Sequence, residues 1–368
     1  MGFKLGLVGL PNVGKSTLFN ALTRTAKAEV ANYPFCTIEP NVGIVAVPDE
    51  RLPIIAQREG SARVVPAVIE FVDIAGLVKN ASKGEGLGNQ FLAHLREVDA
   101  LALVLRCFED ENIVHVEGTV DPVRDAEIVE LELMAKDLET VERRLSKVAK
   151  PARSGDKNAR KEVEHLERLK AILEALEPVR KHTERLSAET LKYARKVLFL
   201  LTVKPMIYIA NVGESGLSEG SSALGPLVRK AEEEGIPLIS VCAELEAQLT
   251  ELPEEEREEM LEAYGLKESG LSKVIREGYR LLDLVTFFTV NEREARAWTV
   301  PQGTPVVKAA GKIHSDMERG FIAAEVINFK DYFEVASLSE ARQKGRLRLE
   351  GRDYLLQDGD LVYIRFKA

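Results

Sequence analysis

Hydrophobic and polar positions along residues 1–115 follow the order strand, helix, strand that is typical of α/β folds. Near-continuous apolar runs at FKLGLVGL (3–10), AVIEFVDIAG (67–76) and ALALVLRCF (100–108) favour strands buried on both faces of a parallel sheet. The segment KSTLFNALTRT (15–25) between the first two runs has helical spacing. Strand-like runs resume at 197–211 and at PLISVCAE (237–244), so we expect one mostly parallel sheet built from two separated stretches of chain.

Residues 120–195 follow a different rhythm, with apolar residues every three or four positions. The first stripe contains Leu131, Met134, Leu138, Val141, Leu145 and Val148, and the second, after PARSGDK (151–157), contains Val163, Leu166, Leu169, Leu173 and Leu176. One narrow stripe on each helix, with a breaker between them, predicts an antiparallel helical hairpin packed as a short coiled coil. We therefore expect a helical arm over 120–195, inserted into a domain formed by 1–119 and 196–281.

From 282 to 368 the apolar runs become short, and turn sequences such as PQGTP (301–305) and QDGD (357–360) separate them. The expected strands are LVTFFTV (284–290), EARAWTV (294–300), FIAAEVI (321–327), DYLLQ (353–357) and DLVYIRF (360–366). The segment TPVVKAAGKIH (304–314) has helical spacing. This order predicts a small mixed β domain with a helix packed across its sheet.

Composition narrows the class of protein. The chain has 368 residues, of which 45% are apolar and 30% charged, and it has no apolar run long enough to cross a bilayer. Its three cysteines, Cys36, Cys107 and Cys242, form no metal-ligand pair and favour a reducing compartment. We expect a cytoplasmic protein, a monomer, with no membrane partner.

The segment GLPNVGKS (9–16) matches the phosphate-binding pattern G-x-x-x-x-G-K-[ST] and lies between an expected strand and an expected helix. Backbone N–H groups of Asn12, Val13 and Gly14 are expected to surround phosphate oxygens, next to the positive end of the helix that follows. Lys15 would contact the outer phosphates, and Ser16 would offer its hydroxyl to Mg²⁺. Thr17 is also expected to bind the nucleotide.

A second phosphate-side motif follows at the end of the strand FVDIAG (71–76). Asp73 occupies the position from which P-loop enzymes hold Mg²⁺, and Gly76 has no side chain to keep an amide from the terminal phosphate. Thr37, in NYPFCTIEP (32–40), is the expected second hydroxyl for Mg²⁺. We expect Ser16, Thr37 and Asp73 to form the metal site.

The segment MIYIANVGES (206–215) places an amide, Asn211, and a carboxylate, Glu214, at the end of an expected strand, where they would read the edge of a flat ligand. In SVCAELE (240–246) the small residues Cys242 and Ala243 would let the backbone lie against a base. Cys242 is not expected to be a nucleophile, since no His is near it in sequence.

Together, Gly9–Ser16, Thr37, Asp73–Gly76 and Asn211–Glu214 resemble the motifs of a translation-factor-type P-loop GTPase of the Obg group. The segment DIAGLVKNASKGEGLGNQFL (73–92) is similar to the Obg form of the second switch. The helical insertion and the C-terminal domain narrow the resemblance to the YchF family, the Obg-like ATPases, over essentially the whole chain. It implies a G domain, an inserted coiled-coil hairpin and a C-terminal β-grasp (TGS) domain.

Against this family background, two positions depart from the usual guanine-reading motif Asn-Lys-x-Asp. Val212 stands at the Lys position, and Glu214, one methylene longer than Asp, stands at the Asp position. We expect relaxed or reversed base selectivity with ATP favoured, because a misplaced carboxylate leaves buried polar groups of guanine unpaired. A conventional GTPase, in which Glu214 adapts to guanine, remains the alternative.

The resemblance also bears on hydrolysis. Leu77 stands where Ras-like GTPases place the Gln that orients water, so the resemblance implies slow intrinsic turnover. Lys15 and Gly76 are the expected catalytic groups, and no general base is nominated. The candidates for positioning the water are Glu85, Asn89, Gln90 and His94. Some related GTPases bind K⁺ through an Asn in this loop, which makes Asn12 a candidate K⁺ ligand.

Charge is uneven along a chain of net charge −9. Residues 143–170 contain ten Lys or Arg against four acids, and EARQKGRLRLEGR (340–352) is also basic. These segments suit anionic partners, and the resemblance implies association with the ribosome, through its large subunit or its RNA. The alternative of a different class is a ribosome or RNA adaptor that uses nucleotide only to hold its shape.

Overall fold

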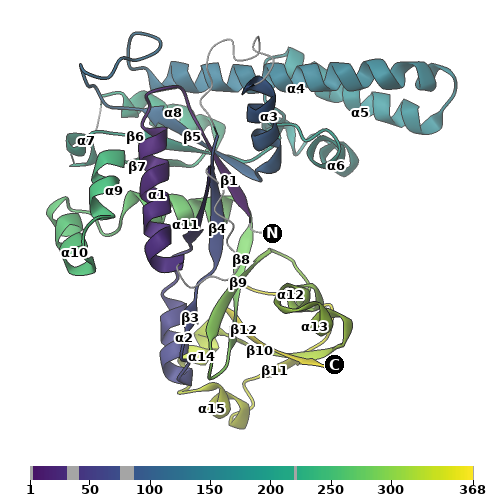
Figure 1. Cartoon of the computed structure of the whole chain (residues 1–368). Helices are drawn as coiled ribbons and strands as arrows, with labels where there is room; N and C mark the ends of the chain where they lie inside the picture. Colours follow the sequence, from purple (N-terminus) through teal and green to yellow (C-terminus); the bar gives the residue numbers. More distant parts are fainter. Residues whose placement is uncertain (1–2, 31–40, 75–86, 219–221, 368) are drawn as a thin grey trace.

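The structure, a computed structural model, describes residues 3–30, 41–74, 87–218 and 222–367. In these ranges the chain forms two six-stranded sheets, one above the other in Figure 1, and one cluster of buried side chains extends across both. In spatial order the first sheet contains β2 (Val42–Ala46), β4 (Val68–Asp73), β1 (Lys4–Val8), β5 (Ala100–Arg106), β6 (Met206–Asn211) and β7 (Leu238–Val241). The second contains β11 (Arg348–Glu350), β10 (Phe321–Asn328), β12 (Asp360–Phe366), β8 (Leu284–Val290), β9 (Ala295–Pro301) and β3 (Val64–Val65).

The first sheet confirms the expected mostly parallel sheet, since only its edge strand β2 runs antiparallel to its neighbour. Its helices are α1 (Lys15–Val30), α3 (Leu87–Glu97), α7 (Glu214–Ser218), α8 (Leu224–Glu234), α9 (Ala243–Leu249), α10 (Glu254–Ala263) and α11 (Gly270–Leu281). Helix α11 packs against Leu5 of β1, whereas Gly6 faces Val98 at the end of α3. Because neighbouring side chains of a strand point to opposite faces, helices cover β1 on both sides.

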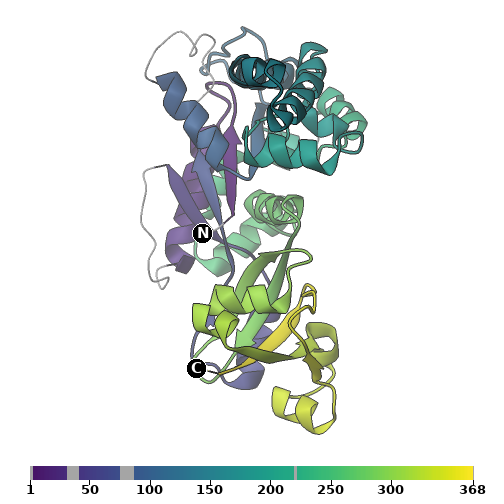
Figure 2. The same cartoon turned by 90° about the vertical axis from the view of Figure 1, so that its right-hand side faces the viewer.

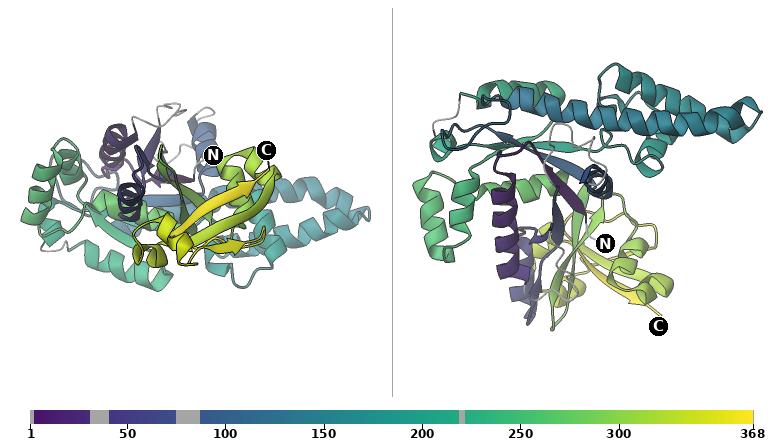
Figure 3. Two further views of the ribbon diagram at one scale, coloured as in Figure 1. Left: turned by 90° about the horizontal axis from the view of Figure 1, so that it is seen from below. Right: turned by 45° about the horizontal axis from the view of Figure 1, so that its top comes forward.

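The expected arm is present as α4 (Pro122–Arg153) and α5 (Lys157–Glu174), followed by η2 (Val179–His182) and α6 (Ala188–Lys196). Figures 1 and 3 show α4 and α5 lying side by side and projecting from the rest of the molecule. Most of the two apolar stripes is buried between them, but the outermost positions are not, since Leu131 is 45% and Leu176 is 65% exposed. Helical spacing thus predicted correctly which residues are buried between the two helices, but it was wrong for the residues at the ends of the stripes.

The second sheet belongs mainly to the C-terminal part, with α12 (Val306–Ile313), α13 (Ser315–Arg319), α14 (Phe329–Phe333) and α15 (Leu338–Gln343). Its mixed pairing and the helix α12 agree with a β-grasp arrangement. The prediction of a strand at 353–357 was wrong: this segment makes a single bridge, from Leu355 to Pro305. Figure 2 shows this part at one end of an elongated molecule and the arm at the other.

One N-terminal segment does not follow the predicted boundary at 282. Helix α2 (Arg51–Glu59) packs on β8 and β9, and β3 pairs in parallel with β9. Arg58 donates hydrogen bonds to three carbonyls of the C-terminal part, including that of Val335 at 2.7 Å. Residues 51–65 therefore complete the second sheet, although the sequence-based boundary placed them in the nucleotide-binding domain.

Residues 197–205, expected as part of a strand, instead form a loop that leads into β6 and is held by the arm. Asp137 of α4 accepts hydrogen bonds from the backbone N–H groups of Leu201 (2.7 Å) and Thr202 (2.8 Å) and from the Thr202 hydroxyl (2.6 Å). Burial, the largest influence, raises the pKa of Asp137 to about 6 despite these donors. No helix in the described ranges is both long and apolar enough to span a bilayer.

The raised pKa of Asp137 predicts a pH-dependent stability. A carboxyl that binds its proton more tightly in the folded chain than in the unfolded one, where its pKa is about 3.9, loses stabilisation as pH rises between about 4 and 6. We expect this group to lower the free energy of unfolding by on the order of 2 kcal/mol across that window. Other carboxyls, such as Glu234, have lowered pKa values and gain stabilisation over the same window, so the test is the difference between two proteins. Urea unfolding at both ends of the window should show a change in unfolding free energy that is more negative in the wild type than in Asp137→Asn. Equal changes in the two proteins would contradict the assignment.

Candidate nucleotide-binding site

The phosphate-binding turn lies where the sequence predicted it, between β1 and α1. Asn12 and Gly14 have φ angles of 63° and 88°, in the left-handed region. A Cβ on Gly14 would lie 2.2 Å from the Asn211 amide nitrogen, so only glycine fits there. Ser16 and Thr17 are exposed at the start of α1, beside a cavity of about 950 Å³. The carboxyl ends of parallel strands meet at this edge, which is the usual ligand site of such sheets.

Asn211 joins three segments at the base of this cavity. Its side-chain N–H donates to the carbonyl of Val13 (2.9 Å), and its side-chain oxygen accepts from the backbone N–H of Ala243 (3.0 Å). The side chain is buried, with 4% of the residue exposed. Asn211 was expected to contact the base, and the structure places it in the lining of the cavity. There its amide also holds the phosphate turn against the loop that follows β7.

Lys15 and Asp73 form an ion pair between the phosphate turn and the end of β4. Asp73 is placed by the register of β4 against β1, in which it lies opposite Leu7. The lysine is almost fully buried, with 8% of the residue exposed. The two charges that the sequence assigned to phosphate and metal therefore neutralise each other across the site.

The structure places Val212 and Glu214, the two positions that depart from the guanine-reading motif, in different surroundings. Val212 and Gly213 both line the cavity, and the valine packs into the core with 1% of the residue exposed. Glu214 does not line it: its carboxylate accepts a hydrogen bond from the Tyr264 hydroxyl at 2.9 Å, and this bond raises the pKa of Tyr264. The expectation that Glu214 lies at the edge of the ligand is therefore not met in this structure, because a tyrosine from outside the motif holds its carboxylate.

Cys242 and Ala243 line the cavity at the end of β7, as expected. Cys242 is 3% exposed, and burial raises the pKa of its thiol. A thiol that resists ionisation is a poor nucleophile, so the geometry agrees with a structural role.

Sequence reasoning missed the cavity wall that follows β5, formed by Phe108, Glu109, Asp110 and Ile113. Arg106, 2% exposed, donates hydrogen bonds to the carbonyls of Phe108 (3.1 Å), Asp110 (3.3 Å) and Ile113 (2.9 Å). An arginine at the end of the otherwise apolar strand ALALVLR was the available signal, since a buried guanidinium must find acceptors.

The same loop is tied to the phosphate turn and to the arm. The Asn12 side chain donates to the carbonyl of Val114 at 3.1 Å. His115, 6% exposed, accepts from the backbone N–H of Glu117 at Nδ1 (3.1 Å), so its Nε2–H donates to Asp125 of α4 (2.8 Å). The arm therefore begins at a loop that forms one wall of the cavity.

Several predicted residues lie outside the described part of the chain. Thr37, Gly76, Leu77 and Glu85 belong to this group, and the side chains of Asn89 and Gln90 also lie outside it. His94 lies on α3 and does not line the cavity. Of the expected metal ligands, the structure brings Ser16 and Asp73 to one edge of the sheet, and a hydroxyl with a carboxylate is a donor set that suits a hard cation.

A turn with this geometry on a mostly parallel sheet, with the ion pair of Lys15 and Asp73 at its mouth, defines a P-loop nucleotide-binding protein of the GTPase type. Residues 4–144 match the family model described as 50S ribosome-binding GTPase, and residues 284–367 match the model YchF-GTPase_C, described as a protein of unknown function. The chain belongs to the YchF family.

The relatives support this assignment along the full length. The chain is 50% identical to the ribosome-binding ATPase YchF of Haemophilus ducreyi and 48% identical to that of Bacillus subtilis, with 100% of each chain covered. Among solved structures, that of the Schizosaccharomyces pombe YchF GTPase matches with a TM-score of 0.89 and 38% identity, covering 99% of this chain and 98% of that one.

The Asn211 geometry predicts the effect of Asn211→Ala. Removing the amide leaves the Val13 carbonyl and the Ala243 N–H unpaired, at a cost of about 1–3 kcal/mol each. We expect ATP and GTP to bind at least about tenfold more weakly, with the ratio of their affinities unchanged. Equilibrium titration with both nucleotides measures this, and Asn20→Ala, an exposed amide on α1, is the matched control. A variant that loses affinity for one nucleotide only would show that Asn211 reads the base.

Proposed function

We propose that the chain is a ribosome-binding ATPase, a switch that binds ATP with Mg²⁺ and hydrolyses it slowly. The observation that carries the proposal is the cavity at the carboxyl edge of the first sheet, where Lys15, Asp73 and the Gly14 turn meet. The names of the relatives supply the nucleotide and the partner.

Phosphate binding would break the ion pair between Lys15 and Asp73 and give each residue a new partner. Lys15 would turn its ammonium to the outer phosphates, and Asp73 would be released toward the metal. Ser16, Thr37 and Asp73 are the proposed Mg²⁺ ligands, and when bound Mg²⁺ neutralises charge on the phosphates. Backbone N–H groups of Val13 and Gly14 hold the phosphate oxygens without any side chain in the way.

Adenine rather than guanine is proposed as the base. The carboxylate of Glu214, which would accept from the N1–H and amine of guanine, is held by Tyr264, and the buried Val212 cannot cover the base plane. Phe108 lies beside Gly213 and offers an aromatic face at the same wall. The fission-yeast relative is named a GTPase, so a guanine-reading state in which Glu214 turns inward is the alternative.

Tyr264→Phe tests this choice of base. Without its hydroxyl partner, Glu214 is free to turn toward guanine, and we expect GTP affinity to rise relative to ATP. In the wild type we expect ATP to bind roughly tenfold more tightly than GTP, the effect of about one unpaired polar group. Competition titrations on both proteins measure the two ratios, with the exposed Tyr363→Phe as control. Tighter binding of GTP by the wild type would contradict the proposal.

We expect slow hydrolysis because the side chain of Leu77 cannot orient water. Lys15 and the Gly76 amide are the proposed groups that stabilise the transferred phosphoryl. Asn12 gives its side-chain N–H to Val114 and retains its oxygen as a ligand, which supports the proposal of K⁺ as a second cation. The adaptor alternative requires that nucleotide be bound and not turned over.

Turnover with and without ribosomes tests the proposed function. We expect slow ATP hydrolysis by the protein alone and faster hydrolysis when ribosomes are added. Lys15→Ala should abolish nucleotide binding in a titration and turnover in both conditions, because it removes the ammonium buried at the phosphate turn. Co-sedimentation with ribosomes in the absence of any turnover would favour the adaptor.

A further inference from the structure

The first sheet ends at the edge strand β7, which has a neighbouring strand on one side only. On that side the carbonyls of Pro237 and Val241 accept hydrogen bonds, of 2.8 Å each, from β6 and the residue that follows it. Because backbone groups alternate in direction along a strand, Leu238 and Ser240 direct their N–H and C=O groups to the other side. Among the described residues no hydrogen bond uses these groups, and residues 238–240 are each partly exposed.

Helices cover both faces of the sheet at this edge. Tyr208 of β6, which lies opposite Leu238 in the register, donates its hydroxyl to Glu234 of α8 at 3.1 Å. Val241 lies three positions after Leu238 and therefore points to the other face, where a Cβ on Gly270 of α11 would be 2.7 Å from its side chain. The outer edge of β7 thus lies between α8 on one face and α11 on the other.

A cavity of about 810 Å³ lies at the amino end of β7. Its apolar lining includes Val228 and Ala231 of α8, Leu281 of α11 and Leu238 of β7 itself. The cavity therefore has walls from both faces of the sheet, and it adjoins the strand whose outward backbone groups are unpaired. Such a place suits an extended chain that adds to the sheet and buries some of its side chains.

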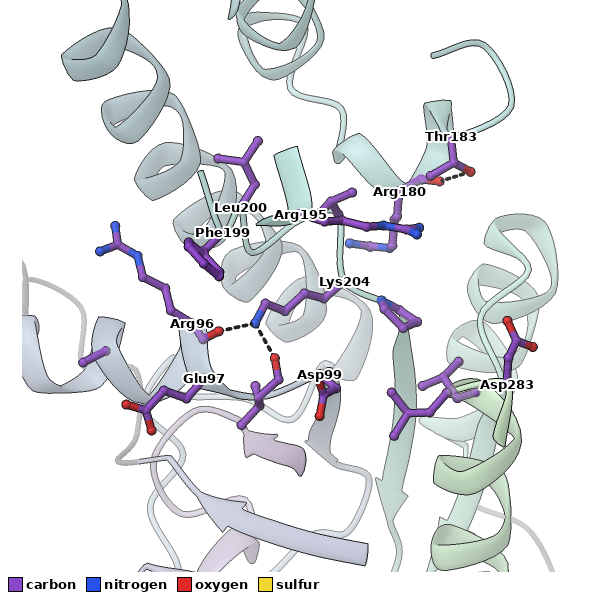
Figure 4. A pocket seen from close by; sticks show the side chains of 16 residues that line it. Arg96, Glu97, Asp99, Arg180, Thr183, Arg195, Phe199, Leu200, Lys204 and Asp283 are labelled. Atoms are coloured by element: carbon purple, nitrogen blue, oxygen red, sulfur yellow. Dashed lines mark hydrogen bonds between the residues drawn. The ribbon is translucent and has the colours of Figure 1, made fainter. Parts of the chain in front are cut away.

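The charged residues that line this cavity are mostly acidic. Three carboxylates, Glu232, Glu277 and Asp283, stand against one guanidinium, Arg280, which leaves a surplus of two negative charges. Within the described ranges no ion pair engages the three carboxylates. Asp283 also lines a neighbouring cavity of about 940 Å³, and Figure 4 shows it on the opposite side of that cavity from Arg96. This charge balance favours a basic ligand.

We propose that β7 and this cavity bind an extended, lysine- or arginine-rich segment of a protein partner, which adds a strand to the first sheet. The outward groups of Leu238 and Ser240 supply the backbone hydrogen bonds, and the cavity holds side chains of the segment. Glu232 on α8 and Glu277 on α11 lie on opposite faces of the added strand, so cations that point to either face find a carboxylate. The inference goes beyond the proposed function and requires no nucleotide.

A second copy of this chain is a poor occupant of the same edge. Pairing two β7 strands would bring the acidic walls of both copies together, and like charges at such short range repel. A segment of opposite charge meets no such cost, which is why we assign the edge to a basic partner.

The probe for this site is a fluorescein-labelled peptide with the alternating sequence Val-Lys-Val-Arg-Val-Lys. We expect it to bind the full chain in fluorescence anisotropy, with an affinity that falls as salt is added. A peptide with Glu in place of every Lys and Arg is the control and should not bind, because it has the same backbone and the wrong charge.

Ser240→Pro tests the strand edge. Proline removes the outward N–H of residue 240 and breaks no bond to β6, since that N–H faces away from it. We expect probe affinity to fall at least about fivefold, the effect of about one lost backbone hydrogen bond. Ser240→Ala retains the N–H and is the matched control, with unchanged affinity. The melting temperature of Ser240→Pro shows whether the fold is intact.

The charges are tested by two double variants that remove equal charge from different places. Glu232→Gln with Glu277→Gln should weaken probe binding and make it less sensitive to salt. Glu255→Gln with Glu256→Gln, on the exposed helix α10, is the matched control and should have a smaller effect. This pair tests the site even if Ser240→Pro does not fold.

Four results would overturn the proposal. The first is no binding of the basic probe by the wild type at about 1 mM, where even a weak specific site is occupied. The second is equal affinity of Ser240→Pro and Ser240→Ala, which would place the probe away from the edge. The third is equal losses in the two double variants, which would mean diffuse attraction. The fourth is a dimer in sedimentation equilibrium that Ser240→Pro abolishes, which would make a second copy the occupant. All four leave ATP hydrolysis and ribosome binding untouched, so failure here is distinguishable from failure of the proposed function.

Discussion

The amide of one buried residue, Asn211, holds the nucleotide site together. It joins the ends of β1, β6 and β7 through bonds to the Val13 carbonyl and the Ala243 N–H. The close approach depends in turn on Gly14, where any Cβ would collide with that amide. The Asn211 amide, which bonds on both sides, and the absence of a side chain at Gly14 thus fix the shape of the phosphate turn. The positions of Lys15 and Ser16 follow from that shape, so the charges of the site act in a geometry that is already set.

This arrangement separates two tasks that the sequence motif Asn-x-x-Glu combines in four consecutive positions. The amide shapes the site, and the carboxylate, held by Tyr264, is withdrawn from it. The position of that carboxylate therefore depends on a residue fifty positions away, directly after α10, which contacts the motif only after folding. The same division applies to Arg106, which does not line the ligand cavity but determines the wall that does.

Local patterns in the sequence were sufficient for the features with local causes. The P-loop, the end of β4 and the seam of the arm follow from spacing that the chain carries within a few turns, and all were predicted. The sequence did not specify the partner of Glu214, the exposure of Leu131 and Leu176, or the loop at 197–205, because each depends on residues far away in the chain. The pairing of β3 with β9 is the extreme case: two residues carry too little pattern to identify a strand, and only the partner strand defines them.

That short strand has a wider consequence. Since α2 and β3 are inserted between β2 and β4 yet belong to the second sheet, the chain passes from the first sheet to the second and back before it reaches the arm. The two sheets are therefore not formed by two successive parts of the chain. The C-terminal part is thus no detachable module: cutting the chain near 282 would leave Arg58 without its acceptors and an unpaired edge on the amino-terminal fragment. Fragments designed by sequence boundaries alone would inherit that defect, and gene fusions that transplant this β-grasp unit need the distant α2–β3 segment as well.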